Sequence, residues 1–593
     1  MQEEGNKAVQ TRLLVGAIDL GTTYSGWAFS TNSDYDRDPM AATVKHWRPG
    51  PGQLVTEKTP TCLLLRPDGT FLAFGYKAET EYIELVKSNK HRCYYLFRRF
   101  KMSLYSEHEQ GLDYMTIKDE MGKTFSAKEV FAKSIKCLVD DMVDTVKRQI
   151  AGTFRQREVH FVLTVPAIWS NLAKQFMREC AIKSGSINAE RLTLALEPEV
   201  ASLYCRHLPI HATGDAETVS VSKFPKGSKH LVLDAGGGTI DIATFEVQDS
   251  SKIRLLTEAS GGDSGGVMVD KAFESLFCDI FGRDVLEELK ENETGDWWDL
   301  ACEIEMRKRA TECTIDGKAT FKFPSVMMEL YTKNQNNKDA TSLEQAIASS
   351  EYGKHVEIKR DKLEIDRSII TNLFNGSMQL IVNYLQELMK EDSMKNVGTI
   401  LMVGGYSESP LLQKTIEDAF PDKQVVIPRD ASAAVLKGAL IFGHNPRSIA
   451  GRVLKYTYGT DTVVPFEEGK HAKEKRFMSA KGYMCLNVFN KMIEKGQTVI
   501  PGQTQVEKTF QTVQECQDLI VLNLFASTEY NPTYVDDDGC VKIGNIYIYL
   551  EPSTQSSDRQ VKLSMAFGDT EIAAHAIDCK TKSEIKVVLS FLG

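Results

Sequence analysis

The stretch that decides the fold is residues 230–247, HLVLDAGGGTIDIATFEV. Apolar residues lead to Asp234, three glycines follow at 236–238, and a second alternating run begins at Thr239. This pattern predicts a strand, a tight glycine turn and a second strand. A turn without Cβ atoms can point backbone N–H groups at a phosphate. Asp234 and Asp241 would repel a bare phosphate but suit a hydrated Mg²⁺, so the stretch indicates a metal–nucleotide phosphate site.

A second copy of this pattern lies in residues 13–26, LLVGAIDLGTTYSG. Its apolar strand ends at Asp19, and Gly21 and the hydroxyls of Thr22 and Thr23 follow. The two aspartates are 234 − 19 = 215 residues apart. This repetition suggests two related lobes that close on one nucleotide.

A third stretch, residues 399–410 (TILMVGGYSESP), predicts a strand followed by Gly404 and Gly405. Ser409 is the expected N-cap of the next helix, with Pro410 at its first position. The glycine backbone could lie against a flat base or ribose. Each of the three motifs alone is weak, because glycine pairs beside strands are often plain hairpins or bulges.

Composition narrows the class of protein. The 593 residues are 42% hydrophobic and 26% charged, which is typical of an ordinary globular protein of several domains. The net charge, 71 − 81 = −10, disfavours nucleic acid and anionic membranes as partners. We expect no secretory signal in the first residues and no membrane span. Twelve cysteines without a C-x-x-C pair favour reduced thiols and a cytoplasmic or nuclear protein.

The three motifs together, in this order, are far more specific. IDLGTTYSG, DAGGGTIDIATFEV and VGGYSESPLLQ resemble the two phosphate loops and the adenosine loop of the 70-kDa heat-shock proteins, in the actin-like ATPase superfamily. The resemblance implies an α/β fold, with a two-lobed actin-like ATPase domain over residues 12–446. It also implies a C-terminal β-sandwich domain over residues 447–593, and ATP or ADP with Mg²⁺ as ligands.

Loop chemistry and resemblance together define the expected site. Asp19, Asp234 and Asp241 would hold Mg²⁺ through water, and Glu197, Asp19, Asp241 and Thr239 are the candidate catalytic residues. The residues expected to bind the nucleotide are Gly21, Thr22, Thr23, Tyr24, Gly236, Gly237, Gly238, Gly265, Gly266, Glu305, Lys308, Arg309, Gly404, Gly405, Tyr406 and Asp430.

Two parts of this set have plainer alternatives. By resemblance Glu197 lies beside the metal and the attacking water, but a glutamate in a first helical turn is also favoured by the helix dipole alone. Glu305, Lys308 and Arg309 have the spacing of the family's adenosine contacts, and they also have the spacing of an everyday surface ion pair.

The cation that contacts the phosphates is left open by the sequence. Residues 92–101, RCYYLFRRFK, contain Arg98, Arg99 and Lys101 as competing candidates, and the whole segment could instead be a half-buried helix with a solvated face. The adenosine region also departs from the family pattern, because Tyr406 and Glu408 stand where that pattern has a serine and an arginine that stacks on adenine. A glutamate cannot supply the cation–π contact, so we expect weaker or rearranged base binding, with Tyr406 as the candidate to stack.

Near residue 446 the sequence pattern changes from alternating helices and strands to short strands. These strands are expected at 519–525, 544–550, 561–567 and 585–591. This part resembles the family's β substrate-binding domain, which implies a protein or peptide client. No helical lid is expected, and the usual acidic, leucine-rich linker is replaced by residues 448–454. Together with YTYG (456–459), EEGKH (467–471) and FGDTEI (567–572), these departures resemble the divergent 12A/12B branch of the family. The sequence does not determine an oligomeric state.

Three functions are compatible with these observations. The leading hypothesis is a slowly ATP-hydrolysing, chaperone-like protein. A nucleotide-sensing scaffold with little turnover is the alternative, favoured by Glu408 and by the absence of a clearly matched lysine. A small-molecule kinase is disfavoured, because it leaves the C-terminal domain unexplained.

Overall fold

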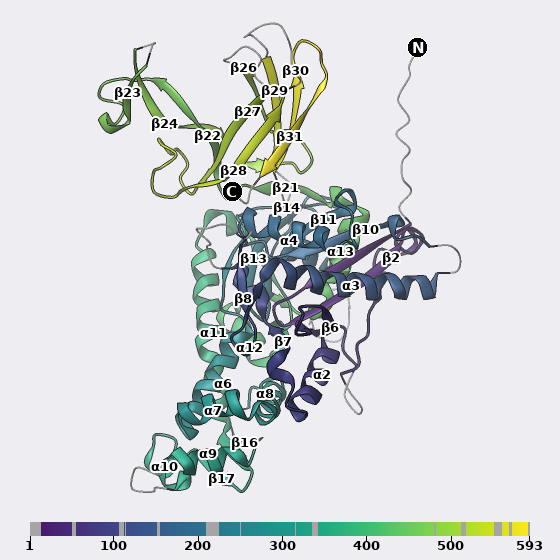
Figure 1. Ribbon diagram of the computed structural model, residues 1–593, viewed down its shortest axis with the longest axis vertical. Coiled ribbons are helices and arrows are strands. Elements are labelled where there is room, and N and C mark those ends of the chain that lie inside the picture. Colours follow the sequence, from purple (N-terminus) through teal and green to yellow (C-terminus); the bar gives the residue numbers. More distant parts are fainter. Residues whose placement is uncertain are drawn as a thin grey trace.

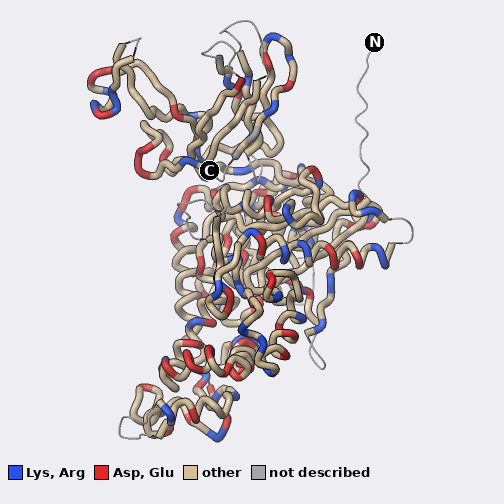
Figure 2. Tube along the Cα trace, in the orientation of Figure 1, with Lys and Arg blue, Asp and Glu red and all other residues tan. Residues whose placement is uncertain are grey.

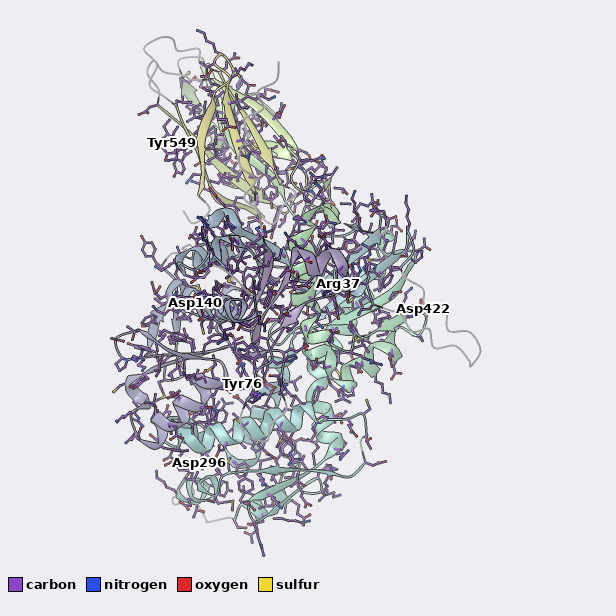
Figure 3. The ribbon with its side chains drawn as sticks, turned by 90° about the vertical axis from the view of Figure 1, so that its right-hand side faces the viewer. Arg37, Tyr76, Asp140, Asp296, Asp422 and Tyr549 are labelled. Carbon is purple, nitrogen blue, oxygen red and sulfur yellow. The ribbon has the colours of Figure 1, made fainter. Side chains whose placement is uncertain are left out.

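The computed structural model describes residues 13–49, 55–105, 112, 114–150, 154–208, 224–249, 251–314, 316–334, 342–479, 482–511, 518–550, 560–567 and 572–590. Figure 1 shows a large α/β body with a β-rich domain at one end. Acidic and basic residues are interspersed along both parts (Figure 2). In the side view of Figure 3, Tyr549 marks the β-rich domain and Asp140, Tyr76 and Asp296 mark the body.

The first lobe is built on a six-stranded sheet in the order β11-β10-β1-β2-β3, with β4 paired to β2. β1 and β10 are buried along their whole length, as expected of strands covered on both faces. Helices α3 and α4 pack on one face of this sheet. The bounds are β1 Leu14–Leu20, β2 Tyr24–Thr31, β3 Thr43–Val44, β4 Thr59–Pro60, β10 Val159–Val165, β11 Leu192–Leu196, α1 Asn32–Arg37, α3 Ala127–Gln149 and α4 Asn171–Lys183.

The second lobe contains an eight-stranded sheet in the order β20-β19-β12-β13-β14-β21-β25, with β15 paired to β13. Helices α6, α11 and α12 pack on its outer face. The bounds are β12 Lys229–Ala235, β13 Ile240–Val247, β14 Ile253–Leu255, β15 Ser260–Gly262, β19 Val397–Val403, β20 Gln424–Val426, β21 Ile449–Val453, β25 Thr498–Val499, α6 Gly266–Phe281, α11 Arg367–Leu388 and α12 Pro410–Ala419.

Two helices, α5 (Glu197–Cys205) and α13 (Ala434–His444), lie between the sheets of the two lobes. Their apolar side chains share one core with residues of β1 and β10 from the first sheet and of β12, β13 and β19 from the second. Gly438 permits their close approach, because a Cβ at this position would overlap the Val200 carbonyl. The central layer therefore joins the lobes beneath the two glycine turns.

Smaller units extend from each lobe. The first lobe carries β5 Cys62–Leu65, β6 Phe71–Phe74, β7 Tyr95–Arg98, β8 Thr116–Lys118, β9 Thr124–Ser126 and α2 Tyr76–Lys87. The second lobe carries α7 Arg283–Asn292, α8 Thr294–Arg309, α9 Val326–Asn334, α10 Leu343–Ser349, β16 Lys318–Lys322, β17 Val356–Lys359 and β18 Lys362–Asp366. In Figure 1 the units of the second lobe and α2 lie in the lower part of the body, and β8 lies near its middle.

The β-rich domain contains a nine-stranded antiparallel sheet in the order β23-β24-β22-β27-β28-β31-β30-β29-β26. All four strands expected there from the sequence are present. Its core draws Leu524 and Ile546 from one half of the sheet and Val561 and Leu563 from the other, which favours the predicted sandwich. The bounds are β22 Thr457–Pro465, β23 Arg476–Ser479, β24 Gly482–Ile493, β26 Val506–Gln511, β27 Leu519–Ser527, β28 Cys540–Tyr549, β29 Gln560–Ala566, β30 Ala573–Asp578 and β31 Glu584–Ser590.

The segment that follows residue 446 does not leave the second lobe at once. β21 pairs in parallel with β14, and β25 pairs with β21, so both strands extend the sheet of that lobe. The domain boundary at 446/447 remains a prediction, and these two strands connect the β-rich domain to the body across it.

Candidate nucleotide site

The two glycine turns, one from each lobe, face each other at close range. β12 and β13 form a hairpin in which Asp234 lies directly opposite Asp241. A Cβ on Gly237 would overlap the side chain of Thr23, and one on Gly238 would lie 2.6 Å from Thr22 Oγ1. Only glycine allows this approach, so the hydroxyls of the first turn pack against the bare backbone of the second.

A cavity of about 450 Å³ lies between the turns. It brings together most of the residues that the sequence singled out, although they span nearly 400 positions of the chain. The predicted residues that line it are Asp19, Gly21, Thr22, Thr23, Tyr24, Glu197, Asp234, Gly236, Gly237, Gly238, Thr239, Gly266, Glu305, Lys308, Arg309, Gly404, Gly405 and Tyr406.

Three predicted residues do not line this cavity. Asp241 lies behind the wall, where its Oδ1 accepts a hydrogen bond from the Ile168 N–H at 3.0 Å. Gly265 packs behind the second turn, and its N–H donates to the Gly238 carbonyl at 3.3 Å. The carboxylate of Asp430 accepts from the Tyr204 hydroxyl at 2.6 Å and also binds Lys437. These three support the wall.

Four carboxylates gather where the two turns meet the cavity: Asp19, Asp234 and Asp241 are buried, and the side chain of Glu197 is 12% exposed. Burial and then the Glu197 and Asp241 charges hold the pKa of Asp234 well above its usual value. Burial and then Glu197 raise the pKa of Asp241 to about 7. Burial also raises the pKa of Glu197 against the attraction of Lys101. Burial is the larger cause and repulsion between the carboxylates adds to it, so an added cation would relieve the repulsion.

Among the three candidate cations of residues 92–101, only Lys101 lines the cavity. Its side chain is 4% exposed, and Nζ lies 2.9 Å from Glu197 Oε1. Arg98 and Arg99 instead line a neighbouring cavity of about 230 Å³ between the lobes. There Arg98 stacks over Trp298 at 4.4 Å and Arg99 pairs with Asp270 at 2.8 Å.

A second lysine in the site was not predicted. Lys58 precedes β4, lines the cavity, and places Nζ 2.6 Å from Asp19 Oδ2. Burial opposes ionisation of Asp19, but the attraction of Lys58 and then Lys101 outweighs it and lowers the pKa of Asp19. Nothing in the residues around Lys58 marks it, because its position follows from the pairing of β4 with β2.

Comparison with known proteins agrees with this geometry. The sequence model of the family described as "Hsp70 protein" matches residues 97–448, more than half of the chain. The chain belongs to the Hsp70 family. It is 32% identical to heat shock 70 kDa protein 12A of Mus musculus over 633 residues, covering 98% of this chain and 92% of the relative. It is 31% identical to human heat shock 70 kDa protein 12B over 639 residues, covering 98% and 91%.

More distant relatives include a chaperone protein dnaK of Thalassiosira pseudonana, 24% identical over 442 residues, with 68% of this chain and 64% of the relative covered. The resemblance to the 12A/12B branch is therefore confirmed. Membership of the Hsp70 family supports nucleotide binding and places the chain among chaperone-like proteins. No described helix of this Hsp70 chain combines the length and apolar character needed to cross a membrane.

The residues present fit the hydrated Mg²⁺ that the Hsp70 family implies. Carboxylate oxygens are the donors that Mg²⁺ prefers, and this ion usually keeps several of its waters. Within the described ranges no three acidic, histidine or cysteine side chains converge closely enough to hold a metal directly. Asp19 and Asp234 line the cavity and Asp241 lies beside it, so the predicted contact with Mg²⁺ through water stays compatible with their positions.

The end of the cavity where the sequence predicts adenosine binding is formed by α8 and the turn after β19. The Arg309 guanidinium lies 4.7 Å from the centre of the Tyr24 ring. Glu305 pairs with Arg309 at 2.7 Å and with Lys308, and these cations outweigh burial and lower the pKa of Glu305 to about 2. Glu408 also lines the cavity, beside the buried Tyr406. Both departures from the family pattern, Tyr406 and Glu408, therefore line the cavity.

Proposed function

We propose that this chain binds Mg-ATP between its two lobes, hydrolyses it slowly, and thereby sets the geometry of a C-terminal domain that binds a protein or peptide client. The observation that carries the proposal is the convergence of both glycine turns, the buried carboxylates and Lys101 on one cavity. Phosphoryl transfer to water asks a protein mainly for positioning and charge stabilisation, and this cavity is equipped for both.

The roles follow from the chemistry of each group. Backbone N–H groups of the turns at 21–23 and 236–238 hold the phosphates, with help from the hydroxyls of Thr22, Thr23 and Thr239. Asp19, Asp234 and Asp241 hold Mg²⁺ through its waters, and the ion neutralises phosphate charge when bound. Glu197 orients the attacking water. Lys101, which pairs with Glu197, supplies positive charge at the transferred phosphate.

Contacts that continue from the site to the β-rich domain support a link between nucleotide and client. Asp241 accepts the N–H of Ile168, and the Ile168 carbonyl accepts Lys455 Nζ at 3.3 Å. Three residues further on, Asn171 Nδ2 donates to the Tyr458 hydroxyl at 2.9 Å. A change in the charge around Asp241 would therefore act on the segment that holds β22.

The test is single-turnover hydrolysis of radiolabelled ATP, with and without Mg²⁺, with nucleotide binding measured in parallel. Glu197→Ala should lose about a hundredfold or more in rate with binding retained, the usual size of a lost water-activating group. Glu190→Ala, an exposed glutamate in the same region, is the matched control and should behave as wild type. Equal hydrolysis by Glu197→Ala and wild type would contradict the assigned role.

A nucleotide-sensing scaffold is the second candidate function. It is favoured by the Lys101–Glu197 pair, which engages the carboxylate that turnover needs for water. Tight binding by wild type and Glu197→Ala with no product from either would establish it. The free cysteines found throughout the described residues favour a reducing compartment, and we propose the cytoplasm, with the nucleus as the alternative. Imaging of the tagged chain in cells checks this.

A further inference from the structure

The strand register brings Lys58 to Asp19. Across the β1–β2 pair Asp19 lies opposite Gly26, and across the β2–β4 pair Ser25 lies opposite Thr59. The same register continues to Lys58 beside Gly26. A Cβ on Gly26 would lie 3.2 Å from Lys58 Cγ. Because Gly26 has no side chain, the stem of Lys58 crosses the middle strand and its ammonium reaches the carboxylate two strands away.

Both oxygens of Asp19 are engaged by the chain itself. Lys58 Nζ lies 2.6 Å from Oδ2, and the Thr164 hydroxyl donates to Oδ1 at 3.0 Å. The side chains of Lys58 and Asp19 are only 16% and 6% exposed, so the pair is shielded from salt and water. Asp19 is thus already neutralised by a fixed cation before any metal arrives.

The charges at this end of the cavity show what Lys58 contributes. Asp19, Glu197 and Asp234 line the cavity, and Lys58 and Lys101 are the lysines that face them. A nucleotide triphosphate carries several negative charges and would be repelled by carboxylates alone. An ammonium that lines the cavity attracts phosphate oxygens as a point charge.

We propose that Lys58 is a built-in cation of the nucleotide site, which contacts phosphate oxygens and lets this chain bind nucleotide with little dependence on Mg²⁺. The inference rests on the proposed nucleotide binding. Lys58 attracts a metal-free phosphate directly, and it also competes with the hydrated ion for Asp19. Both effects reduce the gain in affinity that Mg²⁺ brings.

The test is titration of the full chain with a fluorescent N-methylanthraniloyl ATP, in excess EDTA and in millimolar Mg²⁺. The quantity compared is the Kd in EDTA divided by the Kd in Mg²⁺. This ratio is a binding measurement and needs no turnover. Wild type should show a ratio below about tenfold. Lys58→Met should raise the ratio by about tenfold or more, mainly by weakening binding in EDTA, as expected when a charged hydrogen bond is lost.

Two further variants serve as controls. Lys58→Arg keeps the charge and should keep the ratio near that of wild type. Lys87→Met removes an exposed lysine of α2 that pairs with Glu84, and it should leave both Kd values unchanged. A ratio in Lys58→Met equal to that of wild type would overturn the inference while leaving the proposed function intact. Absence of binding by wild type in both buffers would refute the proposed function itself.

If Lys58→Met does not fold, Asp19→Asn decides the question. This variant keeps Lys58 but removes the charge that holds it. Its metal-free binding should be tighter than that of wild type by several-fold, because the ammonium is free to face the phosphates. Unchanged or weaker metal-free binding by Asp19→Asn would overturn the role of Lys58.

Discussion

The buried ion pair between Arg452 and Glu199 offers the sharpest test of how the β-rich domain is attached. Arg452 lies in β21, and its Nε and a terminal nitrogen donate to the two oxygens of Glu199 at 2.7 and 2.6 Å. The side chains are 7% and 2% exposed. Glu199 lies in the first turn of α5, two residues after Glu197, so the pair ties β21 to the helix that begins at the site.

Arg452→Met leaves the Glu199 carboxylate buried without its partner. Breaking a buried pair in this way costs about 3–5 kcal/mol, whereas an exposed pair contributes about 0–1 kcal/mol. We expect the loss to be local, because β21 is an added strand of the sheet. At about 1.4 kcal/mol per factor of ten, amide protection in β21 and β14 should fall by roughly a hundredfold or more.

Hydrogen exchange of the full chain, followed by mass spectrometry of peptides covering β14 and β21, measures this opening. Arg254→Met is the matched control, because Arg254 lies in β14 and its pair with Glu246 is half exposed. The double variant Glu199→Met with Arg452→Met removes both charges and should recover most of the protection. A loss in Arg452→Met no larger than in the control, or no recovery in the double variant, would refute the reasoning.

Three further predictions follow from the site. The pKa of Asp241 is raised to about 7, so the folded chain holds the proton of this carboxyl more tightly than the unfolded chain does. The protonated carboxyl contributes its full stabilisation below about pH 4, and this contribution is lost as the pH rises through about 7. Nucleotide-free Asp241→Asn should therefore gain up to roughly 4 kcal/mol over wild type between pH 4 and pH 8, and a difference in unfolding free energy that does not change with pH would contradict this. Gly237→Ala should weaken nucleotide binding at least about tenfold in a titration, because its Cβ would lie 2.6 Å from Thr23 Cγ2, whereas Gly398→Ala has open space and should bind as wild type. Asp19→Asn should remove most of the modest gain in affinity that Mg²⁺ brings, as measured in calorimetric titrations, and an unchanged gain would remove Asp19 from the metal shell.

Most of the site could be predicted because its parts are local. A strand followed by glycines and flanked by aspartates carries its chemistry within about ten residues, so residues 13–26 and 230–247 could be interpreted without knowing the rest of the fold. The β strands near the end of the chain were predictable for the same reason, since alternation of apolar residues marks each strand by itself. The sequence could not show that Asp241, Gly265 and Asp430 lie behind the cavity wall. Residues that line a cavity and residues just behind its wall occur in the same motif.

By itself, then, the sequence determined the two phosphate-type turns, the family and the β character of the C-terminal part, all of which depend on short-range pattern. Only the tertiary structure chose Lys101 over Arg98 and Arg99, because neighbouring residues of one segment point into different cavities. Only the register of three strands placed Lys58 beside Asp19, 39 residues away in the chain. The same holds for Arg452 and Glu199, 253 residues apart, which meet because β21 joins the sheet of the second lobe. Contacts of this kind follow from packing between distant segments, which no local pattern records.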